Sequence, residues 1–270
     1  MRALLYDATL CIGCRSCMAA CREKNALPET DAADLTDKQF TVIKTMAGKS
    51  GDMSYRRLCM HCLDPTCASV CPVGALHKTA AGPVVYNPDI CLGCRYCVQA
   101  CPFGVPRYEW TSKTPRVRKC DFCADRLAQG RQNACAEACP TGATIAGERA
   151  ELLQEARKRL AAEPDKYVAK IYGEHDAGGT SVLILSPVSF SRMGLPENLP
   201  AEPLPMLTFR VLSKIPPFVA TGGCFLAGLW WLTNRKEEVA RAEGRRARPP
   251  ASPGAVESGG ERERGKGERQ

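Results

Sequence analysis

The chain has 270 residues, with 37 lysines and arginines against 29 aspartates and glutamates, and a formal net charge of +8. Hydrophobic residues make up 44% of the chain, enough for a packed core, although aromatic residues supply only 6%. Its 17 cysteines are far more than packing requires, which excludes an ordinary soluble domain with incidental thiols.

Sixteen of the 17 cysteines fall into four groups of four along the chain. The first group, CIGCRSCMAAC, and the third, CLGCRYCVQAC, share seven of eleven residues at an offset of 80, so the chain contains an internal repeat. The second, third and fourth groups each end in Cys-Pro-x-Gly, whereas Arg22 follows the first group. In chain order the groups are Cys11, Cys14, Cys17 and Cys21; Cys59, Cys62, Cys67 and Cys71; Cys91, Cys94, Cys97 and Cys101; and Cys120, Cys123, Cys135 and Cys139.

The run C-x2-C-x2-C-x3-C-P is typical of bacterial ferredoxins that bind cubane iron–sulfur clusters. Three thiolates wrap a loop around one cluster, and the fourth points towards the other cluster of a pair. Proline after the fourth cysteine suits a helix entry, and the following glycine suits close approach of the backbone to a sulfide. No group has lost a cysteine, so the sequence predicts four [4Fe–4S] clusters with these sixteen thiolates as iron ligands.

Three other uses of cysteine fit less well. Disulfides need an oxidising compartment, and the opening residues MRALLYDATL lack the basic and apolar stretches of a secretory signal. Structural zinc, as in a zinc-stabilised interaction module, prefers two separated C-x2-C pairs per site. A thioredoxin-type C-x-x-C needs one motif in a βαβ context. A catalytic role is not expected either, because no group leaves an open metal position and no acid–base constellation is evident.

Between the cysteine groups the expected elements are short. The segment 22–54 is polar and loop-like apart from one strand, and a turn at Gly178-Gly179 precedes the last strand. The predicted elements are a strand over 40–46, a hairpin of 75–78 with 83–86, a strand over 143–146, a helix over 148–160 and a buried strand over 181–185.

The composition changes after residue 194. Residues 195–214 form a proline-rich connector, in which GLPENLPAEPLP is expected to be neither helix nor central strand. Residues 215–234 carry no charge and, at 1.5 Å per residue, would make a helix about 30 Å long, the thickness of a hydrocarbon core. Trp230 and Trp231 suit a membrane interface. A membrane span is favoured over a buried core helix, and Cys224 within it is interpreted as a small apolar residue.

Residues 235–270 are expected to be a disordered basic tail, because they are rich in glycine, proline, serine and charge. Six of its ten basic residues lie within 14 residues of the span, so the positive-inside rule predicts a cytoplasmic tail and a periplasmic cluster domain. Nucleic-acid binding is disfavoured because glutamates interleave. No twin-arginine signal is evident, so we expect export with a partner that carries one, a start codon upstream of the given one, or the opposite orientation.

The sequence resembles the four-cluster iron–sulfur subunits of the hydrogenase-2, dimethyl-sulfoxide-reductase and formate dehydrogenase-N group. The resemblance is carried by LLYDATLCIGCRSCMAAC, by the order of the four cysteine groups, and by YGEHDAGGTSVLILSPVSF followed by GLPENLP and one span. It extends from about Leu4 to Asn234. The missing export signal is a departure from the hydrogenase-2 type and matches the formate dehydrogenase-N type.

The resemblance implies an α+β fold of tandem ferredoxin-like dicluster modules over residues 1–194, plus one C-terminal transmembrane helix. It also implies that the cysteine groups pair crosswise: Cys11, Cys14 and Cys17 with Cys139; Cys21 with Cys120, Cys123 and Cys135; Cys59, Cys62 and Cys67 with Cys101; and Cys71 with Cys91, Cys94 and Cys97. Such a subunit relays electrons between a catalytic subunit, a hydrogenase, and a quinone-reactive or cytochrome b membrane subunit.

Two alternatives stay open from the sequence. The chain could serve a formate dehydrogenase-N or another molybdopterin oxidoreductase, or it could be a soluble polyferredoxin whose apolar segment is a core helix. Among single residues, His61 is a candidate donor to a cluster sulfide. Arg15 and Arg95 are candidates to offset cluster charge, with solvated surface arginines as the equal alternative. A residue near Trp230 is a weaker candidate to approach a haem or quinone in a partner.

Overall fold

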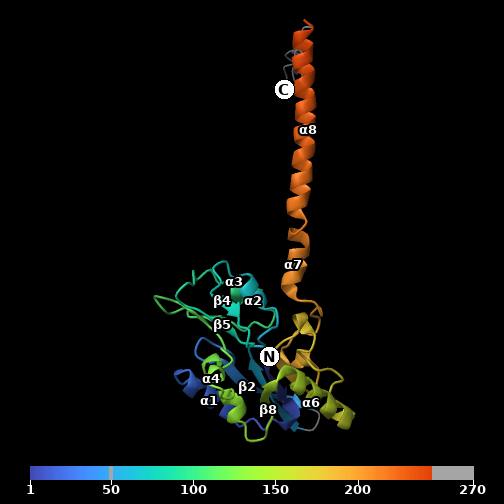
Figure 1. Cartoon of the computed structure of the whole chain (residues 1–270). Coiled ribbons are helices and arrows are strands. Elements are labelled where there is room, and N and C mark those ends of the chain that lie inside the picture. The colour runs from blue at the N-terminus through green and yellow to red at the C-terminus, as the bar shows by residue number, and fades with distance from the viewer. Residues whose placement is uncertain (49–50, 245–270) are drawn as a thin grey trace, which may run out of the picture. The chain divides into compact units, whose positions relative to one another are not determined.

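The structure, a computed structural model, describes residues 1–48 and 51–244. The chain divides into two units, Met1–Val211 and Leu212–Gln270. The first unit mixes short helices with short strands that pair mainly in antiparallel fashion, in agreement with the α+β expectation (Figure 1). The predicted tail beyond residue 244 lies outside the described residues.

A three-stranded sheet in the order β8-β1-β9 organises the first unit. Its strands are β1 (Arg2–Asp7), β8 (Thr144–Glu148) and β9 (Val182–Leu185); β8 is antiparallel to β1 and β9 is parallel to it. The two outer strands match the segments predicted over 143–146 and 181–185. The central strand β1 was not predicted, because its apolar run is short and lies at the start of the chain.

Side chains alternate between the two faces of this sheet, as the pleat of a strand requires. On one face, Leu5 and Leu183 pack with Leu152 and Ala156 of helix α6 (Arg149–Ala162). On the other face lies the larger core, which includes Leu4, Tyr6, Val182 and Ile184 together with Cys17, Cys59 and Cys135. The predicted helix over 148–160 is therefore confirmed, and the sheet separates it from the cysteine-bearing side.

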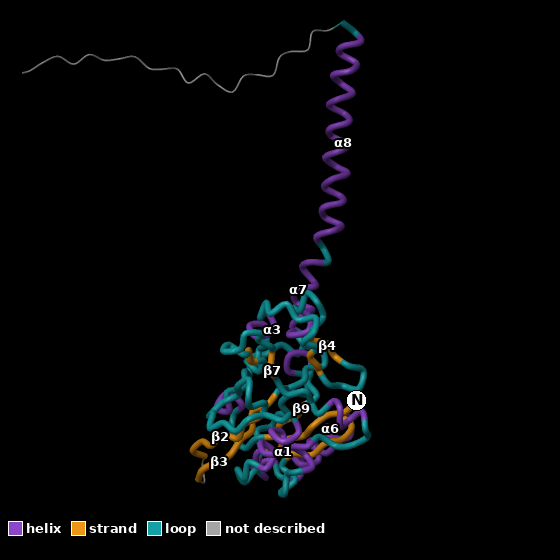
Figure 2. Tube along the Cα trace, turned by 90° about the vertical axis from the view of Figure 1, so that its left-hand side faces the viewer, coloured by secondary structure: helices purple, strands orange, loops and turns teal. Residues whose placement is uncertain are grey.

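Three hairpins complete the strands. The long hairpin of β2 (Thr41–Gly48) and β3 (Gly51–Leu58) lies at one end of the unit (Figure 2). The others are β4 (Leu76–Lys78) with β5 (Val84–Tyr86), as predicted, and β6 (Arg107–Tyr108) with β7 (Val117–Arg118). The expectation that residues 22–54 form a loop was wrong for residues 51–54, where β3 begins. Further along this strand, Tyr55 and Leu58 are buried although polar residues surround them in the sequence.

The short helices begin within the cysteine groups. They are α1 (Ser16–Lys24), α2 (Thr66–Ser69), α3 (Tyr96–Ala100), α4 (Ala124–Ala128) and α5 (Ala134–Glu137). Four 3-10 turns, η1 (Ala8–Leu10), η2 (Pro164–Lys166), η3 (Asp176–Gly178) and η4 (Phe190–Met193), connect other elements. Helix α1 is the longest of the five because Arg22 replaces the proline that follows the other groups, so the helix continues past Cys21.

The C-terminal segment is more helical than its prolines suggested. Helix α7 (Leu204–Leu212) lies inside the predicted connector, because Pro205 occupies its first turn and residues 206–212 contain no helix breaker. Helix α8 (Ile215–Ala242) begins where the span was predicted but continues eight residues past Asn234. The pairs Arg235–Glu238 and Arg241–Glu237, both 3.5 Å, support this extension at helical spacing. Residues 235–242 are thus helical, contrary to the expected disorder.

Candidate functional site

The first and third cysteine groups adopt the same local conformation, which explains their sequence repeat. Gly13 and Gly93 have φ of +72° and +70°, and Arg15 and Arg95 both have φ of +63°. Each arginine precedes a helix, α1 or α3, that carries the third cysteine on its first turn. The left-handed residues turn each loop tightly just before the helix that carries the third thiol.

The Cys-Pro-x-Gly endings form a second repeated element. Gly74, Gly104 and Gly142 have φ of +66°, +60° and +66°, a left-handed conformation that favours glycine. Four backbone N–H groups that follow Cys71, those of residues 73–76, lower the pKa of its thiol although partial burial opposes this. The backbone N–H of Thr144 donates to Cys139 Sγ at 3.4 Å. These turns therefore supply donors that stabilise a thiolate at the fourth position.

A small cavity is lined by four thiols from the first and the fourth cysteine groups, those of Cys11, Cys14, Cys17 and Cys139. We call these four residues the first thiol set. Burial raises the pKa of Cys17, and the charge of the neighbouring Cys135, Cys11 and Cys139 adds to the shift while Arg56 opposes it. The crosswise grouping implied by the resemblance brings the same four residues together.

The second thiol set consists of Cys21, Cys120, Cys123 and Cys135. Burial raises the pKa of Cys21 to about 12, and the nearby Cys135 and Cys123 contribute to the shift. Burial likewise raises the pKa of Cys120 well above its usual range, with contributions from Cys21 and Cys135. Cys21 is therefore close to the fourth cysteine group rather than only to its own.

The third thiol set consists of Cys59, Cys62, Cys67 and Cys101, and the fourth of Cys71, Cys91, Cys94 and Cys97. Burial raises the pKa of Cys62, and Cys59, Cys101 and Cys67 add to it. For Cys97, burial and the charges of Cys71, Cys91 and Cys94 raise the pKa to about 11. These neighbours agree with the four sets that the resemblance implies, and cluster binding by the sixteen residues stays a prediction. Cys224, in contrast, lies exposed on α8.

The four sets follow one another in a series. Cys17 of the first set is electrostatically coupled to Cys135 of the second. Cys120 of the second set is coupled to Cys59 of the third. Cys67 of the third set is coupled to Cys97 of the fourth. Exposed thiols occur at the two ends of the series, at Cys14 and Cys94.

The donor sets fit iron–sulfur clusters in their chemistry. Each set offers four thiols, and backbone N–H groups of Gly93 and Phe122 donate to Cys91 Sγ and Cys120 Sγ at 3.4 Å. Within residues 1–48 and 51–244, no three His, Cys, Asp or Glu side chains are close enough together to hold one metal ion. Four thiolates are the ligand number that a [4Fe–4S] cluster takes.

His61 is buried next to these sets. Its side chain is 1% exposed, its Nδ1 accepts the backbone N–H of Val84 at 3.0 Å, and its ring lies 4.7 Å from that of Phe122. Burial, reinforced by Lys119 and Lys78, lowers its pKa well below the usual range, so the ring is neutral with its proton on Nε2. Nε2 has no hydrogen-bond partner in the described part of the chain. Its role as a donor to a sulfide stays a prediction.

Two buried cations, Arg56 and Lys119, and the half-buried Lys78 were not identified from the sequence. Arg56 is 2% and Lys119 7% exposed, and the Lys78 ammonium donates to the carbonyls of Cys62 and His61 at 2.7 and 3.1 Å. Lys119 donates to the carbonyls of Cys120, at 2.9 Å, and of Val84. Each of these three cations lies within three residues of a cysteine or follows a Cys-Pro-x-Gly turn. This proximity was the sequence signal that could have identified them. Arginine and lysine are so rarely buried that the pattern alone suggested a surface.

The two arginines of the repeat differ in their surroundings. The guanidinium of Arg95 lies 5.0 Å from the ring centre of Trp110 and 5.6 Å from that of Tyr108. Arg15 instead borders the cavity of the first thiol set. Arg95 is thus an exposed arginine that also makes cation–π contacts.

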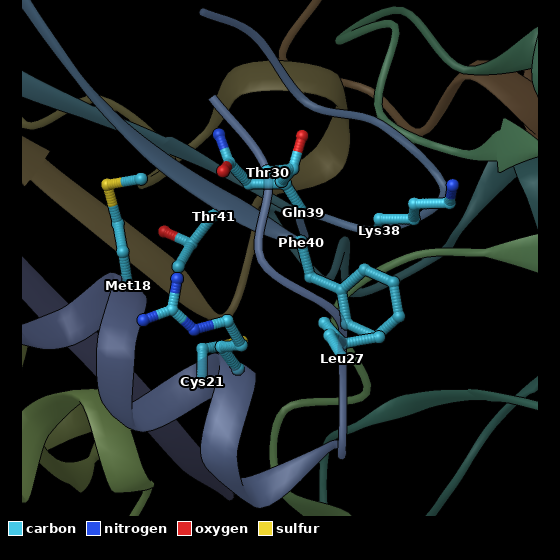
Figure 3. Close-up of a pocket in the computed structure, with 9 residues that line it drawn as sticks. Met18, Cys21, Leu27, Thr30, Lys38, Gln39, Phe40 and Thr41 are labelled. Atoms are coloured by element: carbon cyan, nitrogen blue, oxygen red, sulfur yellow. The ribbon is translucent and has the colours of Figure 1, made fainter. Parts of the chain in front are cut away.

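Next to Cys21 lies a further cavity, between helix α1 and the start of β2 (Figure 3). Met18 and Cys21 enter it from α1, and Thr41 and Phe40 from the opposite side. The Met18 sulfur also accepts the backbone N–H of Ile43 at 3.3 Å. This contact connects helix α1, which carries Cys17 and Cys21, to the β2–β3 hairpin.

The helical stretch Leu204–Ala242 contains a window of 18 residues with a mean hydropathy of 1.4, none of it buried. By length and composition it could cross a membrane. Its exposed side chains include Phe218, Phe225, Trp230 and Trp231.

Comparisons with known proteins agree with the site. Residues 52–149 match the 4Fe-4S dicluster domain family. The chain is 36% identical to the hydrogenase-2 operon protein HybA of Escherichia coli over 238 residues, covering 72% of each chain. It is 36% identical to the iron–sulfur subunit of the nitrate-inducible formate dehydrogenase of Escherichia coli, covering 67% of this chain and 66% of that one. With the formate dehydrogenase iron–sulfur subunit of Haemophilus influenzae it shares 32% identity over 83% of this chain and 78% of the other.

Proposed function

The chain belongs to the family of iron–sulfur electron-transfer subunits that includes HybA and the formate dehydrogenase iron–sulfur subunits, and we propose that it carries four [4Fe–4S] clusters, one in each thiol set. The observation that supports this proposal is the clustering of the sixteen cysteines, of which fourteen are buried or half-buried and Cys14 and Cys94 are exposed, around cavities such as that of the first thiol set. When bound, the clusters supply reversible one-electron transfer. The chain itself supplies ligands, hydrogen-bond donors and shielding from water.

We infer that the sets act as one conduit in two ferredoxin-like dicluster modules. The series from the first to the fourth set supports this, because each set is coupled electrostatically to the next. The exposed loops at the ends carry Ile12, 68% exposed, and Leu92, 70% exposed, beside Cys14 and Cys94. Apolar side chains at both ends suit contacts with partner subunits. No set leaves an open metal position, so the proposed role is non-catalytic.

The proposed partners are a catalytic oxidoreductase subunit and a quinone-reactive or cytochrome b membrane subunit. A hydrogenase is the first candidate, because HybA belongs to a hydrogenase-2 operon. A formate dehydrogenase or another molybdopterin oxidoreductase is the second, because two of the relatives are formate dehydrogenase subunits.

We propose that residues 1–194 form the cluster domain, 195–214 the connector, 215–234 the membrane span and 235–270 a cytoplasmic tail. The apolar, exposed surface of α8 supports the anchor. Arg235, Lys236 and Arg241, at the end of α8, support a cytoplasmic tail and a periplasmic cluster domain.

Anaerobic affinity purification from solubilised membranes, with identification of the co-purified chains, tests this function. We expect a hydrogenase or molybdopterin subunit and a multi-span membrane subunit. Recovery of the chain alone in the soluble fraction, without detergent, would instead support the soluble polyferredoxin.

A further inference from the structure

Arg56, on strand β3, is a buried cation with only neutral hydrogen-bond partners. Its side chain is 2% exposed, Nε donates to Thr41 Oγ1 at 2.8 Å, and Nη1 donates to Thr144 Oγ1 at 3.1 Å. Among the described residues no carboxylate pairs with it, and a buried charge without a counter-charge costs several kcal/mol. The hydroxyls hold the guanidinium in place, but they do not neutralise it. The fold therefore requires negative charge nearby.

Thiols of two sets face this guanidinium. Arg56 lines the cavity of the first thiol set together with Cys17 and Cys139. It also interacts with Cys135 and Cys120 of the second set. Thr41, which orients it, lines the cavity next to Cys21 (Figure 3). Arg56 thus lies between the first and second sets.

The charge of each occupied site is negative. Four thiolates around a [4Fe–4S]²⁺ core have a net charge of about −2, and reduction adds one more negative charge. A guanidinium stays protonated at every pH a protein experiences. It therefore stabilises the reduced site more than the oxidised one, and its shielding from solvent strengthens the effect.

We propose that Arg56 is a counter-charge shared by the clusters of the first and second thiol sets and that it raises the reduction potential of both. This inference rests on the proposed cluster binding. The third set has its own cations, the half-buried Lys78, which donates to the carbonyl of Cys62, and the buried Lys119, whose charge acts on Cys67, so the effect of Arg56 is local to two of the four sites. Arg56 acts through charge and is not a ligand.

The experiment is a potentiometric titration of the full chain in its purified complex, followed by electron paramagnetic resonance, after iron and sulfide have been counted. In Arg56→Gln we expect the two affected clusters to titrate at more negative potentials. At a fixed potential their reduced-to-oxidised ratio should fall at least about tenfold, which is 59 mV for one electron. The other two clusters should titrate as in the unaltered chain. Arg56→Lys keeps the charge and should restore most of the potential.

A matched control is Lys44→Gln on the neighbouring strand β2. Lys44 already pairs with Asp34 at 2.9 Å, so its removal should leave all four potentials unchanged. If the Arg56→Gln chain does not bind its clusters, the variants Thr144→Val and Thr41→Val test the effect of Arg56 on the reduction potentials. Each removes one bond that orients the guanidinium and should shift the same two clusters by a smaller amount.

The inference is overturned if a fully loaded Arg56→Gln chain, or the loaded threonine variants, show unchanged potentials, or if all four clusters shift equally. Absence of iron and sulfide from the unaltered complex has a different meaning, because it overturns the proposed cluster binding itself.

Discussion

Arg15 and Arg95, 80 residues apart in the chain, adopt the same left-handed backbone conformation, with φ of +63° in both and ψ of 7° and 9°. Each closes a C-x-G-C loop and precedes the helix that carries the next thiol. The sequence repeat is therefore a repeat of loop geometry, and the chain uses it at the two ends of its series of thiol sets.

This loop geometry makes Gly13 sensitive to substitution. Gly13 has φ of +72°, and an added Cβ would lie 2.5 Å from Ser54 Oγ. We expect Gly13→Ala to lower the thermal midpoint of the loaded protein more than Gly74→Ala does. Gly74 has a similar φ, +66°, but open space around it, so its substitution costs only the strain of about 1–2 kcal/mol. Equal effects of the two substitutions in a thermal melt would contradict the close contact.

The crosswise pairing of the cysteine groups can be tested by identifying the cluster that each cysteine substitution removes. We expect Cys139→Ser and Cys17→Ser to abolish the same cluster signal, because both residues line one cavity. Cys135→Ser should abolish a different signal, although Cys135 and Cys139 belong to the same sequence group. Electron paramagnetic resonance of the reduced protein distinguishes the signals.

Cys224→Ser is the control for these variants and should leave every signal intact, because its thiol lies exposed on α8 and belongs to none of the four sets. Loss of one common signal from both Cys135→Ser and Cys139→Ser, with Cys17→Ser affecting another, would contradict the crosswise pairing.

His61 is expected to donate from Nε2 to a cluster sulfur of the neighbouring sets. His61→Asn tolerates the left-handed φ of +47° but is too short to place a donor at that point. The titration midpoint of one cluster should therefore move to a more negative potential. His175→Asn is the control, since that side chain is 77% exposed. Unchanged midpoints in both variants would exclude the donor role.

Cluster loss should accelerate as the pH falls. In the cluster-free protein burial raises the pKa of Cys21 and Cys67 to about 12, so these thiols hold their protons tightly. Protons therefore compete with iron for the ligands across the physiological range, and acid shifts this competition towards the thiol. We expect the rate of iron release to a chelator to rise steadily from roughly pH 8 to pH 6. A rate independent of pH would contradict this competition.

The membrane topology predicts which part of the chain a protease reaches. Protease added to spheroplasts should cut the cluster domain and spare a tag at the C-terminus, because the basic residues after the span favour the cytoplasmic side. Reversal of the charge bias, with Lys236 and Arg241 replaced by Glu, should weaken this preference. Protection of the cluster domain together with cleavage of the tag would refute the orientation.

The cysteine spacing predicted a [4Fe–4S] dicluster domain, which the family match over residues 52–149 bears out, because loops that hold a cluster are built from local sequence. The C-x2-C runs, the glycines and the Cys-Pro-x-Gly turns act within about ten residues, so a reader of the sequence can recognise them. The hairpin of 75–78 with 83–86 and the helix over 148–160 were predictable for the same reason, since short-range patterns specify them.

Elements that depend on distant partners were harder to predict. Strand β1 becomes the centre of a sheet only because β8 and β9, more than 130 residues later, pair with it. Apart from its proximity to a cysteine, nothing in the local sequence distinguishes Arg56 from a surface cation. Its burial depends on the two thiol sets and the two threonine hydroxyls that other segments bring next to it. Helix α7 was not predicted either, because prolines were taken as helix breakers, whereas Pro205 lies at the start of this helix.

The most direct test of the account is the iron and acid-labile sulfide content of the anaerobically purified complex, expressed per chain. Four cubane clusters in the four thiol sets predict about sixteen of each. A content of about eight of each would leave two sets without clusters, and zinc without sulfide would contradict the account altogether.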